Sequence, residues 1–221
     1  VMLGHDAFAK SESLTRVFCG GDRLSPELVR RFYTTFNGPD LVNLYGPTEC
    51  TVDSTAHVTK VDENGEVPIG RPIANARAYV LNGDEPVPVG MPGELCIGGR
   101  GVAEGYVGQP ALTAERFVSD PFESGERMYR TGDIARWRRD GTLEYLGRVD
   151  AQVKIRGVRI EPGEVAGTLL MHPTVGETEV IQVDVPGRGR CLVGYVVPEP
   201  GSEGDSETLR AWLAERLPPV M

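Results

Sequence analysis

Asn43-Leu44-Tyr45-Gly46-Pro47-Thr48-Glu49 is the stretch from which the fold of this chain can be worked out. The apolar run from Leu41 to Tyr45 predicts a strand, and Gly46-Pro47 ends that strand in a sharp turn. We expect Thr48 and Glu49 to project from the edge of the strand. A carboxylate is a hard oxygen ligand of the kind that Mg²⁺ takes together with phosphates, and a hydroxyl can donate to a phosphate oxygen. By itself, the stretch fits either a nucleotide site or an ordinary Gly-Pro turn.

Short apolar segments alternate with turns on both sides of this stretch. Gly20-Gly21, Asn82-Gly83 and Asp140-Gly141 are among the breakers. Turns at intervals of about 8 to 12 residues are typical of a barrel or a distorted sheet. Ser25 followed by Pro26 predicts the start of a helix that runs to about Phe36. The other regular segments expected here are strands at 16–19, 78–81, 94–97, 128–131, 134–137 and 143–146 and a helix at 113–117.

The pattern changes after Arg148. Alternating apolar residues around Gly157 predict a hairpin over 152–160, and residues 162–171 have helical spacing. Strands over 179–185 and 191–197 follow, and Ser206 is expected to cap a helix that runs to Leu217. This β-β-α-β-β-α order is typical of a small α+β unit. We therefore predict an α/β part over 1–149 and an α+β part over 150–221.

Composition excludes several classes of protein. At roughly 150 residues per domain, the 221 residues correspond to one and a half domains. The net charge of −9 argues against a general binder of nucleic acid or anionic membranes. The chain has no apolar run of membrane-spanning length, and its first residues lack the order of a signal peptide. The four cysteines include no CxxC pair, which is typical of reduced thiols in a cytoplasm.

The charge is unevenly distributed. Between residues 127 and 159 there are nine Lys and Arg against four Asp and Glu. This basic segment fits either a surface that meets phosphates or solvated strand faces that carry the charges by chance. The three histidines, His5, His57 and His172, show no spacing that is typical of a metal site or a catalytic triad.

Three further motifs follow the opening stretch in order: GELCIGGRGVAEGY (93–106), YRTGD (129–133) and GRVDAQVKIRGVRIEPGEV (147–165). With them the chain resembles the adenylate-forming enzymes, and most of all the amino-acid adenylation domains of nonribosomal peptide synthetases. The resemblance covers most of the chain. It implies that 1–149 is the C-terminal portion of the large nucleotide- and amino-acid-binding subdomain, a distorted sheet or β-barrel. It also implies that 150–221 is the small mobile C-terminal α+β subdomain, truncated before its last motif.

The resemblance implies a ligase that uses ATP and Mg²⁺. An amino acid becomes an aminoacyl-adenylate with release of pyrophosphate, and the phosphopantetheine thiol of a peptidyl carrier protein then accepts it. The protein is expected to be cytoplasmic, with no nucleic acid and no membrane as partner, and an MbtH-like protein is a possible further partner near residues 75–81. The family's phosphate loop and amino-group Asp precede residue 1 and its carboxylate Lys follows residue 221. We therefore expect a fragment that is inactive alone.

The resemblance also implies roles for individual residues. Asp133 is expected to accept hydrogen bonds from the two ribose hydroxyls. The Tyr45 ring is expected to stack on adenine, and the Asn43 amide is expected to form hydrogen bonds with the edge of that base. The nucleotide-binding positions are Asn43, Tyr45, Gly46, Thr48, Asp133, Tyr145 and Arg148.

Catalysis is assigned to Thr48, Glu49 and Lys154, with Glu49 also the metal ligand. An ordinary strand lysine that faces solvent is the alternative for Lys154. Asp150 is the expected hinge, and Gly157 lies in the loop that enters the site in the thioester-forming state.

The family's substrate-pocket positions here are Phe18, Gly20, Leu44, Val52 and Asp53. A carboxylate at Asp53 among apolar walls predicts a serine-like or a basic amino acid as substrate. The glycine-rich GGRGVAEGY lacks the GK[ST] ending of a phosphate-binding loop, so it is expected to be a structural segment of the barrel.

Two other functions stay open. One is an acyl- or aryl-CoA synthetase of the same superfamily, with CoA as the acceptor. The other is a non-catalytic module that keeps the fold for docking a carrier protein. Retention of Thr48, Glu49, Asp133 and Lys154 favours a working enzyme over such a module.

Overall fold

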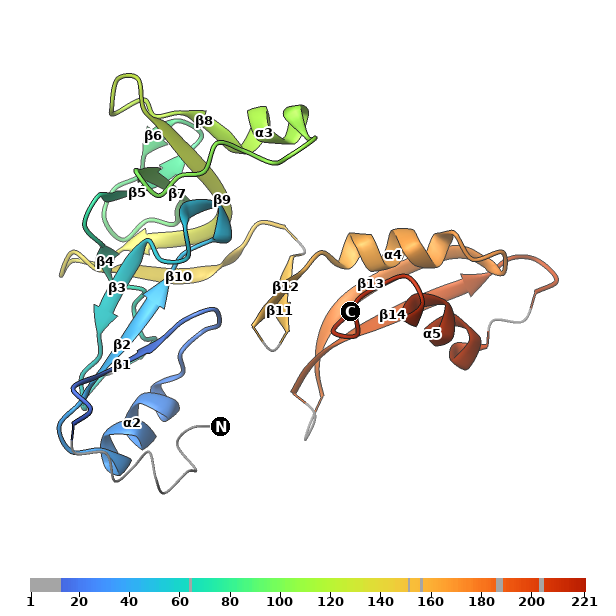
Figure 1. Cartoon of the computed structure of the whole chain (residues 1–221), viewed down its shortest axis with the longest axis horizontal. Helices are drawn as coiled ribbons and strands as arrows, with labels where there is room; N and C mark the ends of the chain where they lie inside the picture. The colour runs from blue at the N-terminus through green and yellow to red at the C-terminus, as the bar shows by residue number, and fades with distance from the viewer. Residues whose placement is uncertain (1–12, 64, 151, 156, 186–188, 203–204) are drawn as a thin grey trace. The chain divides into compact units, whose positions relative to one another are not determined.

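The structure is a computed structural model that describes residues 13–63, 65–150, 152–155, 157–185, 189–202 and 205–221. The chain divides into two compact units, Val1–Val149 and Asp150–Met221 (Figure 1). The assignment of these units to the large and small subdomains of a longer enzyme stays a prediction.

The first sheet of the first unit has the strand order β1-β2-β3-β4. β1 (Arg16–Cys19) and β2 (Asp40–Tyr45) are parallel, whereas β3 (Thr55–Val58) and β4 (Arg71–Pro72) join antiparallel. The connection from β1 to β2 is α2 (Pro26–Thr35). This expected helix is confirmed, because the Ser25 Oγ accepts a hydrogen bond from the Leu28 N–H at 3.2 Å.

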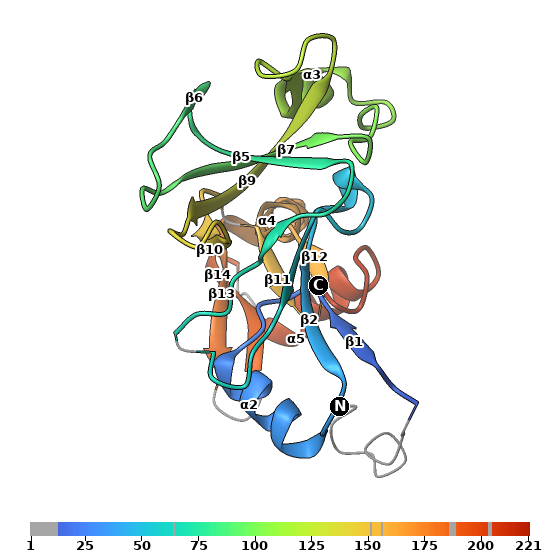
Figure 2. The ribbon, with the colours of Figure 1, turned by 90° about the vertical axis from the view of Figure 1, so that its left-hand side faces the viewer.

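The second sheet is antiparallel, with the order β10-β9-β7-β5-β6 (Figure 2). β8 also pairs with β9. Its core contains Leu95, Ile97, Tyr129 and Leu143, all exposed by 1% or less. A sheet of this kind was expected. Its elements are β5 (Ala76–Asn82), β6 (Glu85–Pro86), β7 (Gly93–Gly99), β8 (Phe117–Ser119), β9 (Arg127–Trp137) and β10 (Leu143–Arg148), with α3 (Pro110–Arg116) before β8.

The expected pair of strands at 128–131 and 134–137 is wrong, because β9 runs through both segments without a break. The register between β7 and β9 shifts between Glu94 and Cys96, and Gly132 takes a φ of +71°. A bulge of this kind absorbs extra residues within one strand and re-aims a side chain. Asp133 is the residue that directly follows this bulge glycine.

The second unit has the expected β-β-α-β-β-α order. Its elements are β11 (Val153–Ile155), β12 (Val158–Ile160), α4 (Pro162–Leu170), β13 (Val175–Val185), β14 (Gly189–Pro198) and α5 (Ser206–Ala214). β11 and β12 form one two-stranded sheet and β13 and β14 form another. The core includes Ile160, Val165, Leu169 and Leu209.

The expected bounds of the last helix are wrong in two respects. Its N-cap is Asp205 and not Ser206, since the Asp205 carboxylate accepts from the backbone of both Glu207 and Thr208. The helix also ends at Ala214, although Leu217 still packs against the core of the unit. Along the described part of the chain, no helix is both long and apolar enough to cross a membrane.

Candidate functional site

The turn after β2 is tight. A Cβ added to Gly46 would lie 2.4 Å from the Val52 carbonyl oxygen, so only glycine lets the loop fold back here. Thr51 and Val52 have φ angles of 58° and 72°, a region that β-branched residues rarely adopt. Such strain concentrates at functional sites. The short 3-10 helix Thr48–Cys50 follows Gly46-Pro47.

Thr48 and Glu49 differ in exposure. Thr48 is exposed, whereas Glu49, which was expected to project with it, is buried with only 8% of its surface exposed. The Glu49 Oε1 accepts hydrogen bonds from the hydroxyls of Tyr106 at 2.6 Å and Tyr129 at 2.8 Å. Burial raises the pKa of Tyr106, and its hydrogen bond to Glu49 raises that pKa further, so the hydroxyl remains a donor.

Sequence reasoning missed Tyr106 and Tyr129 as partners of Glu49. Both tyrosines lie in quoted motifs, GGRGVAEGY and YRTGD, but only Asp133 received a role. A signal for them existed in the sequence, because a carboxylate such as that of Glu49, if buried, needs hydrogen-bond donors. A tyrosine can supply one, since its ring packs in a core while its hydroxyl donates.

Tyr45, Asp133 and Arg148 meet at one point of the first unit. The Arg148 Nη1 donates to Asp133 Oδ1 at 2.7 Å, and the Tyr45 hydroxyl donates to Asp133 Oδ2. The Tyr45 and Tyr145 rings lie 6.4 Å apart between centroids. Burial raises the pKa of Tyr45 and the adjacent Asp133 charge raises it further. The structure therefore brings together four of the predicted nucleotide residues from β2, β9 and β10.

The bulge in β9 fixes the direction of the Asp133 carboxylate. The Thr131 hydroxyl donates to the Leu95 carbonyl at 2.6 Å and accepts from the Asp133 N–H at 3.0 Å. The Gly132 N–H donates to Glu94 Oε1 at 3.2 Å. Asp133 then pairs in register with Arg148 on β10. The Thr-Gly-Asp sequence thus aims the carboxylate through its own backbone.

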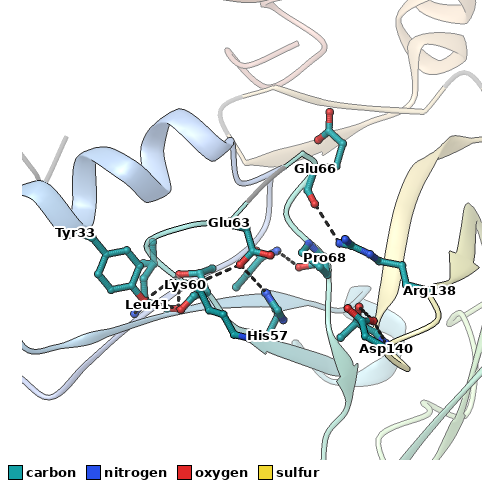
Figure 3. Close-up of polar contacts among 12 residues, drawn as sticks. Tyr33, Leu41, His57, Lys60, Glu63, Glu66, Pro68, Arg138 and Asp140 are labelled. Carbon is teal, nitrogen blue, oxygen red and sulfur yellow. Dashed lines mark hydrogen bonds and ion pairs between the residues drawn. The ribbon is translucent and has the colours of Figure 1, made fainter.

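Asn43 has a structural partner within the first sheet. Its Nδ2 donates to the Pro68 carbonyl at 2.8 Å, and the residue is only 4% exposed. Asn43 pairs with His57 on β3, whose Nε2 lies 3.1 Å from Glu63 Oε2 (Figure 3). The Asn43 amide therefore connects β2 to the segment before β4. Its contact with adenine stays a prediction.

The predicted pocket residues lie on and beside β1 and β2, and two of their apolar side chains are well exposed. Phe18 is 60% exposed and Val52 is 71% exposed. A Cβ added to Gly20 would lie 3.0 Å from the Leu44 carbonyl oxygen, so this glycine lets the two segments approach. Burial raises the pKa of the Asp53 carboxyl. The pocket role of these residues stays a prediction.

Asp150, Lys154 and Gly157 belong to the second unit. Asp150 Oδ1 accepts from the Gln152 N–H at 3.3 Å, and Lys154 on β11 pairs with Arg159 on β12. Gly157 has a φ of +80°, as the hairpin turn requires. Their roles in hinge motion and thioester formation stay predictions.

The donor set for a metal ion is small. Over the described ranges, no group of three His, Cys, Asp or Glu residues could hold a metal, and His5 lies outside those ranges. Mg²⁺ usually takes one or two carboxylates and completes its shell with waters and substrate phosphates. The buried carboxylate of Glu49, which directly follows Thr48 in the sequence, fits that need. The four cysteines are free, and burial raises the pKa of Cys50 to about 12.

Two family models match the chain in order. The model of the AMP-binding enzyme matches residues 2–107, and that of the AMP-binding enzyme C-terminal domain matches residues 164–221. Phosphinothricin tripeptide synthetase PhsB of Streptomyces viridochromogenes is 52% identical over 97% of this chain. Tyrocidine synthase 3 of Brevibacillus parabrevis is 46% identical over 99% of the chain. The chain spans 18% and 3% of the lengths of these two relatives.

Solved structures have the same fold. The crystal structure of IdnL1 is similar with a TM-score of 0.86 and 29% identity, over 99% of this chain and 45% of that one. PA1221, described as a peptide synthetase protein containing adenylation and PCP domains, is similar with a TM-score of 0.77 and 30% identity. That match covers 91% of this chain and 42% of PA1221.

Proposed function

We propose that the protein to which this chain belongs is an ATP-dependent amino-acid ligase of nonribosomal peptide synthesis. The proposal starts from the family, since the chain belongs to the AMP-binding enzymes. In the first half-reaction an amino-acid carboxylate attacks the α-phosphorus of ATP. The bond to pyrophosphate breaks and an aminoacyl-adenylate forms. The synthetases that the chain is similar to support this proposal.

The observation that carries the proposal is the convergence of Tyr45, Asp133 and Arg148. A carboxylate whose orientation is fixed can accept two vicinal ribose hydroxyls. Arg148, which donates to that carboxylate, is proposed to contact ribose or phosphate. The Tyr45 ring offers a face for adenine. Since little covalent work falls to the protein, catalysis rests on positioning and on charge stabilisation by groups such as the Thr48 hydroxyl.

Glu49 is the residue that would hold Mg²⁺, shared with the nucleotide phosphates. When bound, the ion supplies positive charge beside those phosphates. The carboxylate supplies a hard oxygen ligand from a buried and hydrogen-bonded position.

The second half-reaction is proposed to involve the second unit. The thiol of a phosphopantetheine arm on a peptidyl carrier protein attacks the carbonyl of the adenylate, and AMP leaves as the thioester forms. Asp150 is the proposed hinge, and Lys154 and Gly157 are the proposed residues of the thioester-forming state. An MbtH-like protein that binds near residues 75–81 is a further proposed partner.

Asp53 is the proposed determinant of the substrate. A half-buried carboxylate whose pKa is raised by burial gains from a donor or a cation in the substrate side chain. We therefore expect a serine-like amino acid or a basic one such as ornithine, lysine or arginine.

Amino-acid-dependent exchange of pyrophosphate into ATP tests the proposal, with the protein at its natural length and a panel of amino acids. Exchange with a hydroxyl-bearing or basic amino acid is expected. A preference for a large apolar or acidic amino acid would contradict the proposal that Asp53 determines the substrate. Activation of a free acid with CoA as acceptor would favour an acyl-CoA synthetase, and nucleotide binding without exchange would favour a docking module.

A further inference from the structure

The glycine-rich segment 98–106, expected only to be structural, contacts the Thr48–Cys50 turn and its C-cap residue Thr51 at several points. The Ala103 N–H donates to the Glu49 carbonyl at 2.9 Å, so the backbone of Glu49 is held from this side. The Thr51 hydroxyl donates to the Gly101 carbonyl at 2.8 Å. A Cβ added to Gly101 would lie 2.9 Å from the Cys50 carbonyl oxygen, so a glycine is needed for this approach.

Tyr106 ends this segment and is itself fixed. Its N–H donates to the Thr113 hydroxyl of α3 at 2.9 Å. A Cβ added to Gly105 would lie 2.3 Å from Thr113 Cγ2, so the glycine before Tyr106 allows that contact. The Phe117 ring packs against both phenols, with centroids 5.3 Å from Tyr106 and 5.0 Å from Tyr129. The two hydroxyls therefore reach Glu49 from rings with little freedom to move.

Both hydroxyls meet the same carboxylate oxygen. Tyr106 and Tyr129 donate to Glu49 Oε1, and their own oxygens lie 3.1 Å apart. The Tyr106 distance of 2.6 Å is in the range of a strong hydrogen bond between a neutral O–H and a charged carboxylate. Two donors on one oxygen fix the rotation of the carboxylate about its last bond. A metal that took both Glu49 oxygens would have to displace a tyrosine.

We propose that Tyr106 and Tyr129 are positioning residues that hold the Glu49 carboxylate in the orientation in which it binds a magnesium–nucleotide complex. This inference rests on the proposed function. The glycine-rich segment then contributes to nucleotide binding indirectly, because it places the Tyr106 hydroxyl within hydrogen-bond distance of Glu49.

The test measures ATP binding by calorimetry, with Mg²⁺ and with EDTA, for the protein at its natural length. The quantity of interest is the gain in affinity that Mg²⁺ brings. Tyr106→Phe removes one hydroxyl from a half-buried ring, and we expect it to reduce that gain about tenfold, as expected for loss of a hydrogen bond to a charged group. Affinity in EDTA should stay within about twofold of wild type.

A double-mutant cycle separates positioning from general damage to the fold. In a Glu49→Gln background, Tyr106→Phe should change the Mg²⁺-linked gain by less than about twofold, because the ligand through which the tyrosine acts is gone. The matched control is Tyr79→Phe, since the Tyr79 hydroxyl donates to another buried carboxylate, Asp120, at 3.1 Å. This control should leave the Mg²⁺-linked gain unchanged.

Glu49→Asp is a second test of the same role that does not depend on the folding of the tyrosine variant. It keeps the charge and both tyrosines, but it is one methylene shorter and cannot keep both hydrogen bonds while binding the nucleotide complex. It should lose the Mg²⁺-linked gain as Tyr106→Phe does. The inference would be overturned if Tyr106→Phe reduced the Mg²⁺-linked gain in ATP affinity equally in the wild-type and Glu49→Gln backgrounds. It would also be overturned if either Tyr106→Phe or Glu49→Asp kept the full wild-type gain.

Failure of the proposed function has a different signature. In that case the wild-type protein itself shows no ATP binding or no amino-acid-dependent exchange, and both proposals fall together. A wild-type protein that binds and exchanges, with variants that keep the Mg²⁺-linked gain, leaves the proposed function standing and removes only the positioning role.

Discussion

Asp133 is held by two donors from different strands, Tyr45 on β2 and Arg148 on β10. Its side chain is only 9% exposed, and that of Arg148 is 14% exposed. Breaking a partly buried pair of this kind is costly, because it leaves the other charge without its partner. Exchange of the carboxylate for an amide keeps the shape of the side chain and removes the charge and one acceptor.

Asp133→Asn is expected to weaken AMP binding by about 10- to 100-fold, as the loss of charge-assisted hydrogen bonds predicts. Equilibrium dialysis or calorimetry with AMP measures the effect. Asp84→Asn is the matched control, since the Asp84 side chain is 80% exposed and lies in the turn between β5 and β6, in the same sheet as β9. Similar AMP affinity for wild type and Asp133→Asn would remove Asp133 from the nucleotide site.

The bulge of β9 orients the Asp133 carboxylate through the backbone of the strand. Gly132 at a φ of +71° lets the chain turn within the strand, and the Thr131 hydroxyl satisfies the Asp133 N–H. An alanine in this left-handed region costs about 1–2 kcal/mol.

Gly132→Ala should therefore lower the free energy of unfolding by about 1–2 kcal/mol and weaken AMP binding as well. Gly125→Ala is the control, because Gly125 has a φ of +78° and an added Cβ there would meet no atom within 4 Å. Chemical denaturation should show a similar loss of stability for both variants. If the two variants weaken AMP binding equally, the bulge has no special role in aiming Asp133.

Asp205 is the N-cap of α5. Hydrogen bonds from the backbone and side chain of Thr208, and then from the backbone of Glu207, lower the pKa of the Asp205 carboxyl. A group whose folded pKa is below its unfolded pKa stabilises the fold above the unfolded value. That contribution is lost as the pH falls through the folded pKa.

Asp205→Ala should lower the melting temperature at neutral pH, and the difference from wild type should shrink as the pH falls below about 4. Asp205→Asn is the control, since asparagine caps a helix about as well and does not titrate. Circular dichroism of thermal unfolding at several pH values measures both variants. A difference for Asp205→Ala that is independent of pH would contradict capping by the ionised carboxylate.

Each of the two units has a hydrophobic core of its own. In the first unit Leu95 is 0% exposed, and in the second unit Leu169 is 4% exposed. They belong to separate apolar clusters, and the boundary between the units falls between Val149 and Asp150.

Leu95→Ala is expected to destabilise the first unit by about 2–5 kcal/mol, through lost burial and the cavity that remains. Hydrogen exchange followed by mass spectrometry should show faster exchange in β7 and β9, with β13 and β14 unchanged. Leu169→Ala is the reciprocal control and should affect the second unit alone. Faster exchange in both units for either variant would show that they unfold together.

Local chemistry made much of the fold predictable. Ser25-Pro26 predicted the start of α2, and Gly157 predicted the hairpin turn, because capping and positive φ depend on neighbours in sequence. The same local reasoning failed at Gly132, where pairing with β7 carries β9 through a glycine that looked like a break. It also chose Ser206 over Asp205 as the cap, since both residue types are good N-caps.

The motifs along the chain indicated the family and the residue types available for the site, and periodicity predicted the β-β-α-β-β-α order of the second unit. In the first unit β3, β4, β6 and β8 were not predicted from the sequence, and β9 was predicted as two strands. Which of these side chains contact one another depends on how the chain folds. Tyr45 and Asp133 are 88 residues apart, and Tyr129 is 80 residues from Glu49. No local rule couples such distant positions. Tyr45 lies on β2 of the first sheet and Asp133 on β9 of the second, so the packing of the two sheets brings them together. A buried carboxylate also needs hydrogen-bond donors, which these phenols supply.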